Sequence, residues 1–380
     1  MEEPMALPPE AYTALDWFDR EQRSIFERTW QFAGFVEDLA EPGAFRAVPV
    51  GRLNIAVVRH GDGDLRAFHN VCRHRGAQLL RASGRGDAIV CPYHLWRYDL
   101  DGQLDHVPMQ GEEFPNLDKK KFCLKRAGVG VWRGMVFVHP DPDAEPVETF
   151  FAPMDAHMGP YRPDELPELE LARTSTVVRA NWKVIVENWI DVYHLSQLHS
   201  DTLYIGDHAN AEFAWHGPHW TFREPLTAEY ADGIENRSPL PLLPGFDTSN
   251  PVVRAPMLYP NLGVFEGESS WSTFHVVPVS PTESRIETRT RIAPASIPAR
   301  ALQAAKSLWN APRRPARKHV QQHPSDPIGS GNFIAEDNYV CEQQQRGFES
   351  PMFEQGPMAR HAEGPVREFR KRIRARVADA

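Results

Sequence analysis

The chain has 380 residues, which at the usual ~100–200 residues per domain predicts two domains or one elaborated domain. Its 41% hydrophobic and 24% charged residues are typical of a soluble globular protein and argue against disorder of the whole chain. The net charge of −9 lacks the basic excess of a nucleic-acid-binding protein, so we expect no nucleic-acid partner. The first ten residues contain no apolar run and no stretch approaches about 18 consecutive apolar residues, so we expect a cytoplasmic protein without a membrane span.

The first half of the chain changes from a helical to a β-rich pattern. A helix is predicted over 19–36, where Ile25, Phe26, Trp30 and Ala33 lie roughly on one helical stripe. Short β-rich runs separated by Gly, Asp and Pro turns follow, and they predict a small all-β unit. These runs are 44–50, 53–59 and 129–138.

A proline- and acid-rich stretch, 140–146, is the predicted boundary to a mixed region. The helices predicted beyond it are 147–158, 182–198, 299–309, 333–346 and 364–376, and the strands are 172–179, 272–279 and 284–292. The last two strands flank a short turn and predict a hairpin. The expected domains are an N-terminal helical segment at 1–40 that packs on the last domain, an all-β domain at 41–145 and a mixed domain at 146–380.

Two short pairs of candidate metal ligands lie in the β-rich region. Cys72 with His74 forms one pair and Cys91 with His94 the other. A zinc finger normally groups its cysteines in one pair and its histidines in the other, which is not this order. A Rieske [2Fe-2S] cluster takes two cysteines on one iron and two histidines on the other, and two mixed loops supply that set. The order favours iron–sulfur over zinc, and the remaining alternative is two buried thiols with two hydrogen-bonded core histidines.

The segments around these pairs, NVCRHRG (70–76) and CPYHLWRY (91–98), resemble the Rieske domain of non-haem iron oxygenase large subunits. The resemblance implies that Cys72, His74, Cys91 and His94 bind the cluster. One departure is Leu95, where that family commonly has glycine. This difference removes no ligand, but it changes the loop next to His94.

A second candidate metal site lies in NWKVIVENWIDVYHLSQLH (181–199). Asp191 and His194 share a helical face, whereas His199 is roughly 140° from His194 on an ideal helix. Both histidines can bind one metal only if the helix ends or distorts between them. Two histidines and one carboxylate form the facial triad of Fe(II) oxygenases, with open positions for O₂ and substrate. Hydrogen-bonded histidines without a metal are the alternative.

This segment also resembles the iron-binding helix of the same oxygenase family, which implies that His194 and His199 bind Fe(II). The third ligand is expected on a later helix, and FIAEDNYVCEQQQR (333–346) resembles the segment that carries it. Matching this segment to the corresponding segment of the family points to Asp337 as the third ligand, with Glu336 as the alternative. Both acids also fit the start of a solvated helix, where carboxylates favour the helix dipole.

The resemblance gives Asp191 a role of its own, as a carboxylate that joins His194 to a Rieske histidine of a neighbouring subunit. The expected histidine is His94, with His74 as the alternative. Such an acceptor orients an imidazole and shortens the path for electrons. Asn188, one turn earlier, matches a position near the iron, and an ordinary helix-surface amide explains it equally well.

The resemblance covers about 30–370 and implies the catalytic alpha subunit of a Rieske non-haem iron oxygenase, in the aromatic-ring-hydroxylating dioxygenase family. It implies an α+β fold class, with an all-β Rieske domain and a catalytic domain whose antiparallel sheet is covered by helices, similar to START and Bet v1 folds. Electrons from NAD(P)H are expected through a separate reductase, with or without a ferredoxin, because the chain has no G-x-G-x-x-G fingerprint. The implied assembly is a head-to-tail homotrimer.

The sequence leaves the reaction open. Hydroxylation or dihydroxylation of an aromatic or other hydrophobic small molecule with O₂ is slightly favoured, because Asp191 and Asn188 resemble the ring-hydroxylating type. Oxidative N- or O-demethylation of a betaine-like methylated amine is the alternative, because 341–358 resembles members that act on methylated amines. A Rieske electron-transfer protein without oxygenase activity and a zinc-bound module are more remote hypotheses.

The sequence also contains weaker indications of function. Trp215, Trp220 and Trp271 lie where the substrate is expected, although core packing explains them as well. Lys119–Lys121 form a basic cluster that fits either a dock for an acidic electron donor or a solvated surface. Cys123 and Cys341 are expected to be inert packing residues.

Overall fold

The computed structural model describes residues 7–200, 202–309, 323 and 325–378, with 304–309 described by their backbone alone. Contacts within the chain divide it into two compact units. The β unit is Glu21–Ala152, and the α+β unit combines Met1–Arg20 with Pro153–Asp379. The segment expected to form a single N-terminal piece, 1–40, is therefore shared between the two units.

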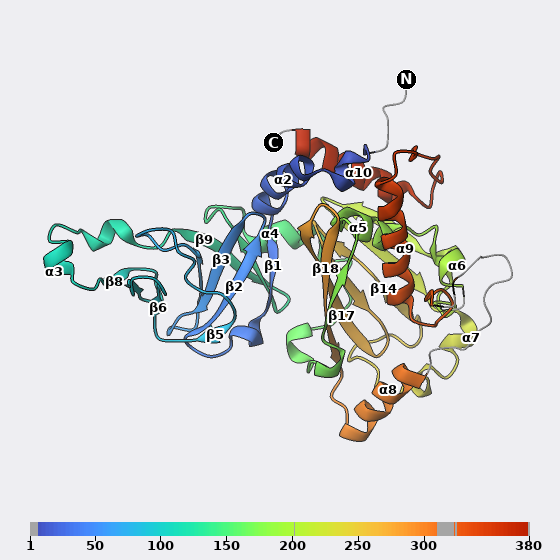
Figure 1. Cartoon of the computed structure of the whole chain (residues 1–380). Coiled ribbons are helices and arrows are strands. Elements are labelled where there is room, and N and C mark those ends of the chain that lie inside the picture. The colour runs from blue at the N-terminus through green and yellow to red at the C-terminus, as the bar shows by residue number, and fades with distance from the viewer. Residues whose placement is uncertain (1–6, 201, 310–322, 324, 379–380) are drawn as a thin grey trace. The chain divides into compact units, whose positions relative to one another are not determined.

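The β unit contains two antiparallel sheets (Figure 1). The strand order is β1-β10-β9-β4-β3-β2-β5 in the larger sheet and β6-β7-β8 in the smaller one. Their bounds are β1 Gln31–Phe35, β2 Ala44–Val50, β3 Leu53–Arg59, β4 Leu65–His69, β5 Gly84–Arg85, β6 Ile89–Val90, β7 Arg97–Tyr98, β8 Leu104–His106, β9 Arg126–Trp132 and β10 Met135–His139. The run expected over 129–138 is split into β9 and β10 by a tight turn at Arg133 and Gly134, whose φ values are 50° and 76°.

The helix predicted over 19–36 is wrong in its second half. Helix α2 (Leu15–Ser24) ends early, and β1 is a fully buried strand paired with β10. Consecutive apolar residues such as Phe32 and Ala33 fit a buried strand as well as the apolar face of a helix, so periodicity alone does not distinguish a strand from a helix here. Pairing with β10 decides the conformation.

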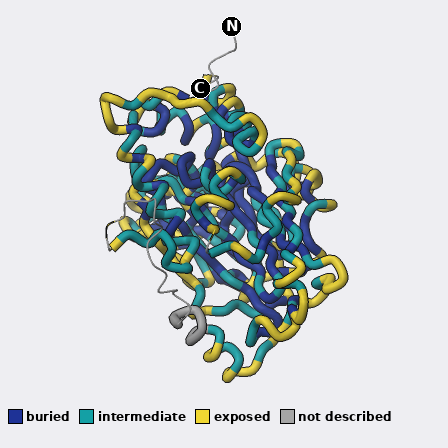
Figure 2. Tube along the Cα trace, turned by 90° about the vertical axis from the view of Figure 1, so that its right-hand side faces the viewer, coloured by how far each residue is buried: buried dark blue, intermediate teal, exposed yellow. Residues whose placement is uncertain are grey.

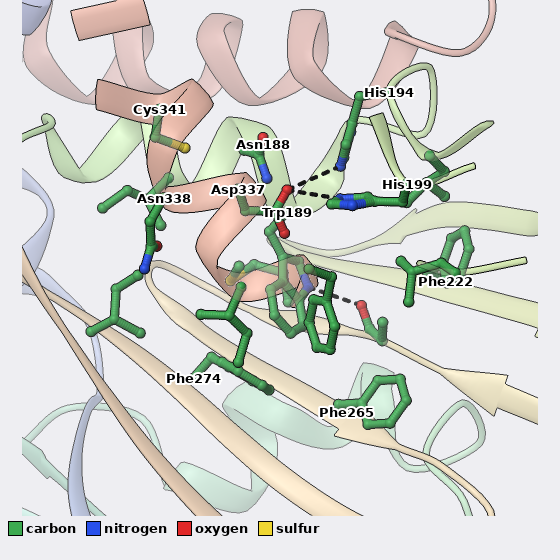
Figure 3. A pocket seen from close by; sticks show the side chains of 18 of the residues that line it. Asn188, Trp189, His194, His199, Phe222, Phe265, Phe274, Asp337, Asn338 and Cys341 are labelled. Carbon is green, nitrogen blue, oxygen red and sulfur yellow. Dashed lines mark hydrogen bonds and ion pairs between the residues drawn. The ribbon is translucent and has the colours of Figure 1, made fainter. Parts of the chain in front are cut away.

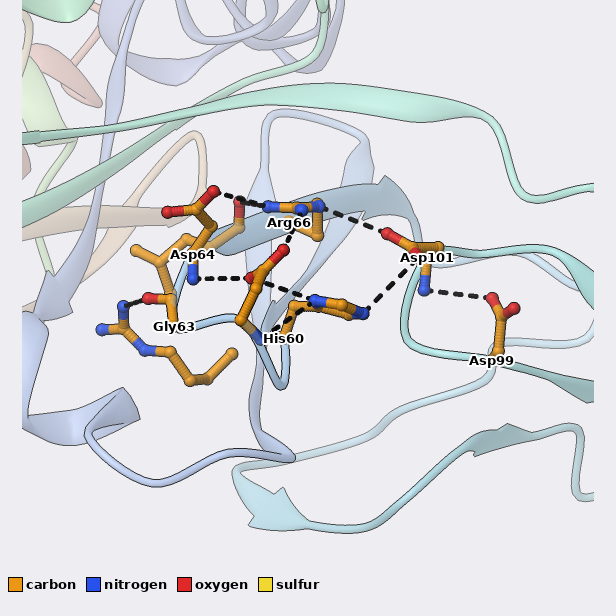
Figure 4. A network of polar contacts seen from close by, with 9 residues as sticks. His60, Gly63, Asp64, Arg66, Asp99 and Asp101 are labelled. Carbon is orange, nitrogen blue, oxygen red and sulfur yellow. Dashed lines mark hydrogen bonds and ion pairs between the residues drawn. The ribbon is translucent and has the colours of Figure 1, made fainter.

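A polar network joins the β3–β4 hairpin to the turn before β8 (Figure 4). Arg66 donates to Asp62 at 2.8 Å and to Asp101 at 3.3 Å, and His60 lies between the same two carboxylates. The backbone N–H of Asp64 and the His60 ring are the main causes that lower the pKa of Asp62 to about 2. The network ties the hairpin end to the segment that follows the second candidate ligand pair.

The α+β unit is built on an eight-stranded antiparallel sheet in the order β11-β18-β17-β16-β14-β13-β12, with β15 paired to β13 and β16. The bounds are β11 Thr174–Val178, β12 Glu212–His216, β13 His219–Pro225, β14 Val252–Arg254, β15 Met257–Leu258, β16 Leu262–Glu266, β17 Ser270–Ser280 and β18 Glu283–Ile292. The hairpin expected at 272–292 is present as β17 and β18. Strands β16 and β18 are mostly buried, whereas the edge strand β11 is mostly exposed. Buried segments lie in the interior of the chain and exposed segments lie toward its outside (Figure 2).

Helices pack on this sheet, as the α+β prediction requires (Figure 1). Those outside the β unit are α1 Glu10–Thr13, α5 Trp182–Ile190, α6 Leu195–Leu198, α7 Ala228–Ala231, α8 Ile297–Trp309, α9 Phe333–Phe348 and α10 Gly364–Ala378. The β unit contains α3 Gln110–Glu113 and α4 Val147–Phe151, so the helix expected over 147–158 is much shorter. The Trp189 ring on α5 lies 5.0 Å from the Phe274 ring on β17, which places α5 directly against the sheet.

A buried ionic network holds α5 against the terminal helices. Glu187 on α5 accepts hydrogen bonds from Tyr12 at 2.7 Å and from Arg370 on α10 at 2.6 Å. Gln345 on α9 joins the same group through the backbone oxygen of Tyr12. These residues are almost inaccessible to solvent, so the network fixes the helices that carry the candidate site.

Candidate active site

The helix predicted over 182–198 is interrupted where the metal site requires it. Helix α5 ends at Ile190, Asp191 is extended (φ −80°, ψ 116°), and α6 begins after His194. The break turns the His194 and His199 rings toward each other, with centroids 5.1 Å apart. The two imidazoles therefore face one point, which an unbroken helix would prevent.

Asp337 completes this group from helix α9 (Figure 3). Asn332 caps the helix by accepting a hydrogen bond from the Ala335 N–H, and this cap sets the start of the turn that presents Asp337. Asp337 Oδ1 lies 2.9 Å from His199 Nε2 and 3.6 Å from His194 Nε2. One donor atom from each residue lies within 4.8 Å of the others, a spacing that suits a metal ion.

Glu336, the alternative to Asp337, points to the other side of His199. Its carboxylate is fully buried, lies 2.8 Å from His199 Nδ1 and accepts a hydrogen bond from Thr202. Burial opposes protonation of His199, but the hydrogen bonds to Asp337 and Glu336 outweigh it and raise the pKa of His199 to about 9. Glu336 thus orients the imidazole whose other nitrogen faces Asp337.

Asp191 lies at the helix break beside His194. Its Oδ1 accepts a hydrogen bond from the Tyr193 N–H at 2.7 Å, and its Oδ2 is 3.4 Å from His194 Nδ1. That Nδ1 is buried and makes no hydrogen bond to any described residue. Asp191 is therefore near enough to orient His194, while Asn188 lines the cavity next to the triad.

The β unit brings the other four candidate ligands together. The His74 and His94 rings are 4.7 Å apart, and Trp96 stacks on His74. Cys72 and Cys91 are buried and form no disulfide. The Nδ1 atoms of both histidines are buried and unpaired among the described residues, so each is available as a ligand.

The environment of these four side chains also suits a metal cluster. Burial and the neighbouring His94 and Arg75 lower the pKa of His74, which favours the neutral imidazole that binds metals. The Tyr98 hydroxyl lies 3.4 Å from Cys72 Sγ, within hydrogen-bonding distance of the sulfur. Leu95, between His94 and Trp96, is 59% exposed and has a backbone φ of 58°. Glycine adopts this left-handed backbone conformation more easily than leucine does.

Comparison with known proteins agrees with both groups. A family model described as "Ring hydroxylating alpha subunit (catalytic domain)" matches residues 163–379, and one described as "Rieske [2Fe-2S] domain" matches 29–124. The chain belongs to the Rieske ring-hydroxylating oxygenase alpha subunits. The expected family is confirmed, and the cofactors that it implies are a Rieske [2Fe-2S] cluster and a mononuclear non-haem iron.

Curated relatives of this oxygenase divide by substrate. A glycine betaine monooxygenase oxygenase subunit of Chromohalobacter salexigens is 36% identical over 52% of this chain and 44% of its own length. A carnitine monooxygenase oxygenase subunit of Escherichia coli is 34% identical over 58% of this chain and 59% of its own length. A chlorobenzene dioxygenase alpha subunit of a Cupriavidus species is 33% identical over 49% of this chain and 42% of its own length. The chain thus spans about half the length of the relatives that it matches.

Solved structures confirm the fold. A quaternary ammonium Rieske monooxygenase in complex with an inhibitor superposes with a TM-score of 0.76 at 22% identity, covering 97% of this chain and 94% of the other. Naphthalene 1,2-dioxygenase from a Rhodococcus species superposes with a TM-score of 0.72 at 17% identity, covering 98% of this chain and 95% of the other. Within the described part of the oxygenase, no helix has the length and apolar character that crossing a membrane requires.

A cavity of about 180 Å³ opens onto the triad of the oxygenase (Figure 3). Helices α5, α6 and α9 form one wall, and the sheet forms the other. Trp189 packs closely against β16 because Gly263 has no Cβ; a Cβ there would lie 2.9 Å from the indole. Besides the triad, the lining is Ile185, Asn188, Trp189, Leu195, Leu203, Ile205, Trp220, Phe222, Glu224, Val253, Ala255, Met257, Phe265, Phe274, Val276, Ile286, Phe333, Ile334, Asn338 and Cys341.

Only one of the three candidate tryptophans reaches this cavity. Trp220 lines it, whereas Trp215 packs against the Arg372 guanidinium and Trp271 donates to buried Glu266. The sequence interpretation missed Trp189 and Glu224. The alternating burial of β13 places Trp220, Phe222 and Glu224 on one face, and this period-2 pattern was the available signal.

Proposed function

We propose that this chain is a terminal oxygenase in which His194, His199 and Asp337 hold Fe(II). The supporting observation is that three donor atoms from two separate helical segments converge in the lining of a largely apolar cavity. Bound iron would activate O₂ there. Asp337 and the two imidazole Nε2 atoms occupy one side of the site, which leaves the cavity side for O₂ and substrate.

The same proposal assigns Cys72, His74, Cys91 and His94 to the Rieske cluster, supported by their two unpaired Nδ1 atoms and free thiols. Electrons from NAD(P)H would reach the cluster through a reductase, with or without a ferredoxin. Asp191, which lies beside His194, would face a Rieske histidine of a neighbouring copy in a homotrimer. The trimer and a cytoplasmic location remain predictions from the sequence.

For the reaction we propose oxidative N-demethylation. Glycine betaine and carnitine monooxygenase subunits are among the most similar relatives, and the aromatic walls of the cavity attract a methylated ammonium group by cation–π interaction. An N-methyl group, O₂, two electrons and two protons would give formaldehyde, water and the demethylated amine. A quaternary substrate would release one further proton.

Hydroxylation of an aromatic ring is the second candidate. The chlorobenzene dioxygenase relative and the largely apolar lining favour it, because a neutral ring would bury its surface against Phe222, Phe265 and Phe274.

The test is a turnover assay with anaerobically purified protein, added Fe(II), a Rieske-oxygenase reductase and NAD(P)H. We expect formaldehyde from N-methylated amines, in proportion to the NAD(P)H and O₂ consumed. The control is His194→Ala, which should abolish the product and keep the visible spectrum of the cluster. Diols or phenols from arenes without formaldehyde would select the second candidate, and an unchanged rate in His194→Ala would overturn the metal assignment.

A further inference from the structure

The sheet wall of the cavity carries a carboxylate that the metal triad does not use. Glu224 on β13 is 6% exposed and faces the cavity with Trp220 and Phe222, because alternate residues of a strand point to the same side. Among the described lining residues, Glu224 and Asp337 are the acids and none is a lysine or arginine. A carboxylate on an apolar wall is unfavourable unless something compensates its charge.

The compensation that the chain itself provides is partial. His208 Nδ1 lies 2.5 Å from Glu224 Oε1, whereas Oε2 makes no hydrogen bond within the described part of the chain. Gly206 packs directly against this oxygen, and a Cβ at that position would overlap it. The backbone therefore makes room for the carboxylate at the cavity wall and leaves one oxygen without a donor.

The rings beside Glu224 suit a positive charge. Trp220 and Phe222 stack with centroids 5.8 Å apart on the same strand face, and Phe265 lies on the neighbouring wall. Aromatic faces attract a weakly hydrated cation, and a buried carboxylate adds a full opposite charge in a region that little water reaches. A neutral arene gains nothing from Glu224.

We propose that Glu224 is a specificity residue that binds the positively charged nitrogen of the substrate, with Phe222, its neighbour on the same strand face, packing beside it. This inference rests on the proposed demethylation, because it names the substrate as a cationic amine. It assigns the two walls separate tasks: the helices hold the iron and the strand β13 selects the charge.

The test measures binding without turnover. The holoprotein, with cluster and iron but without reductant, is dialysed against benzyltrimethylammonium and against its uncharged carbon isostere, neopentylbenzene. We expect the cation to bind about tenfold or more tightly than the isostere, as a desolvated cation–π site with a carboxylate implies. In Glu224→Gln this preference should fall to near unity, while the affinity for the isostere stays the same.

The matched control is Glu212→Gln, an exposed acid on the adjacent strand β12, which should keep the preference. If Glu224→Gln does not fold, as judged by circular dichroism, His208→Gln replaces it. That variant keeps the carboxylate and removes its internal partner, so the cation should bind more tightly. Equal binding of both probes, binding of neither, or a preference that no variant changes would overturn the proposal.

Binding and turnover separate the two hypotheses. A cation preference that depends on Glu224, without formaldehyde production, would contradict the demethylation and leave the charged subsite standing. Formaldehyde production that is indifferent to Glu224→Gln would retain the demethylation and remove the role of Glu224.

Discussion

The two candidate metal-binding regions differ in how much of the chain each one needs. The four candidate ligands of the Rieske cluster lie between Cys72 and His94 on two loops of one small β unit. The triad joins His194 and His199 to Asp337 on a distant helix, and it depends on the break between α5 and α6 and on the packing of α9. The local site should therefore tolerate damage that the distributed site does not.

The largest expected effect comes from Asp337→Ala. Loss of this carboxylate should reduce the iron content from about three to about two per chain and lower activity roughly a hundredfold or more, since even indirect partners of a metal contribute about 10–100-fold. Metal analysis and the visible spectrum measure both sites in one sample. If three irons per chain remain, Asp337 is not a ligand.

A second test of the comparison is Arg370→Leu, at a residue that neither belongs to the triad nor lines the cavity. Arg370 neutralises buried Glu187, so its removal should lower the free energy of unfolding of the α+β unit by about 3–5 kcal/mol. Urea unfolding followed by circular dichroism, with cluster absorbance in parallel, checks this. Mononuclear iron should be lost first, whereas the exposed Lys371→Leu should behave like the parent protein.

Glu336→Gln sharpens the contrast between holding a metal and orienting its ligand. The variant removes the charged partner of His199 Nδ1 and should weaken Fe(II) binding by about 10–100-fold without removing the site. Fe(II) titration of the metal-depleted protein provides the measurement, with the exposed Glu354→Gln as control. A complete loss of iron would make Glu336 a ligand itself.

In the β unit, Leu95→Gly should be stabilising. The left-handed conformation of Leu95 is unfavourable by about 1–2 kcal/mol, and the extra backbone entropy of glycine offsets part of this, so a gain of roughly 0.5–1 kcal/mol is expected. Leu95→Ala keeps the strain and should show no gain. Thermal unfolding monitored by cluster absorbance distinguishes these outcomes.

The smallest effect concerns Asp62 in the polar network. Its pKa is lowered from about 3.8 to about 2, so its stabilising contribution is present above pH 4 and is lost as the pH falls through 2. The difference in melting temperature between the parent and Asp62→Asn should shrink from pH 6 to pH 3. A difference independent of pH would exclude an ionic origin.

The sequence predicted the local site more completely than the distributed one. The alternation of Cys and His around 72–94 indicates a metal cluster even when the fold is unknown, because few other metal sites use that order of ligands. The separate tasks of Glu336 and Asp337 required the orientation of α9, since adjacent residues on a helix project about 100° apart. Glu224 was missed because a charged residue is usually exposed, and the alternation along β13 that places it on the buried face is visible only once this segment is recognised as a strand.

The cavity draws its reactive groups from helices and its shape from strands, and this separation has an evolutionary consequence. Substitutions on β13, β14, β16 and β17 can change what the cavity accepts while the candidate donors that flank α6 and the one on α9 stay where they are. New substrates can thus be acquired through point changes in the sheet, without any change in the candidate metal ligands. Laboratory libraries restricted to the sheet wall would exploit the same independence.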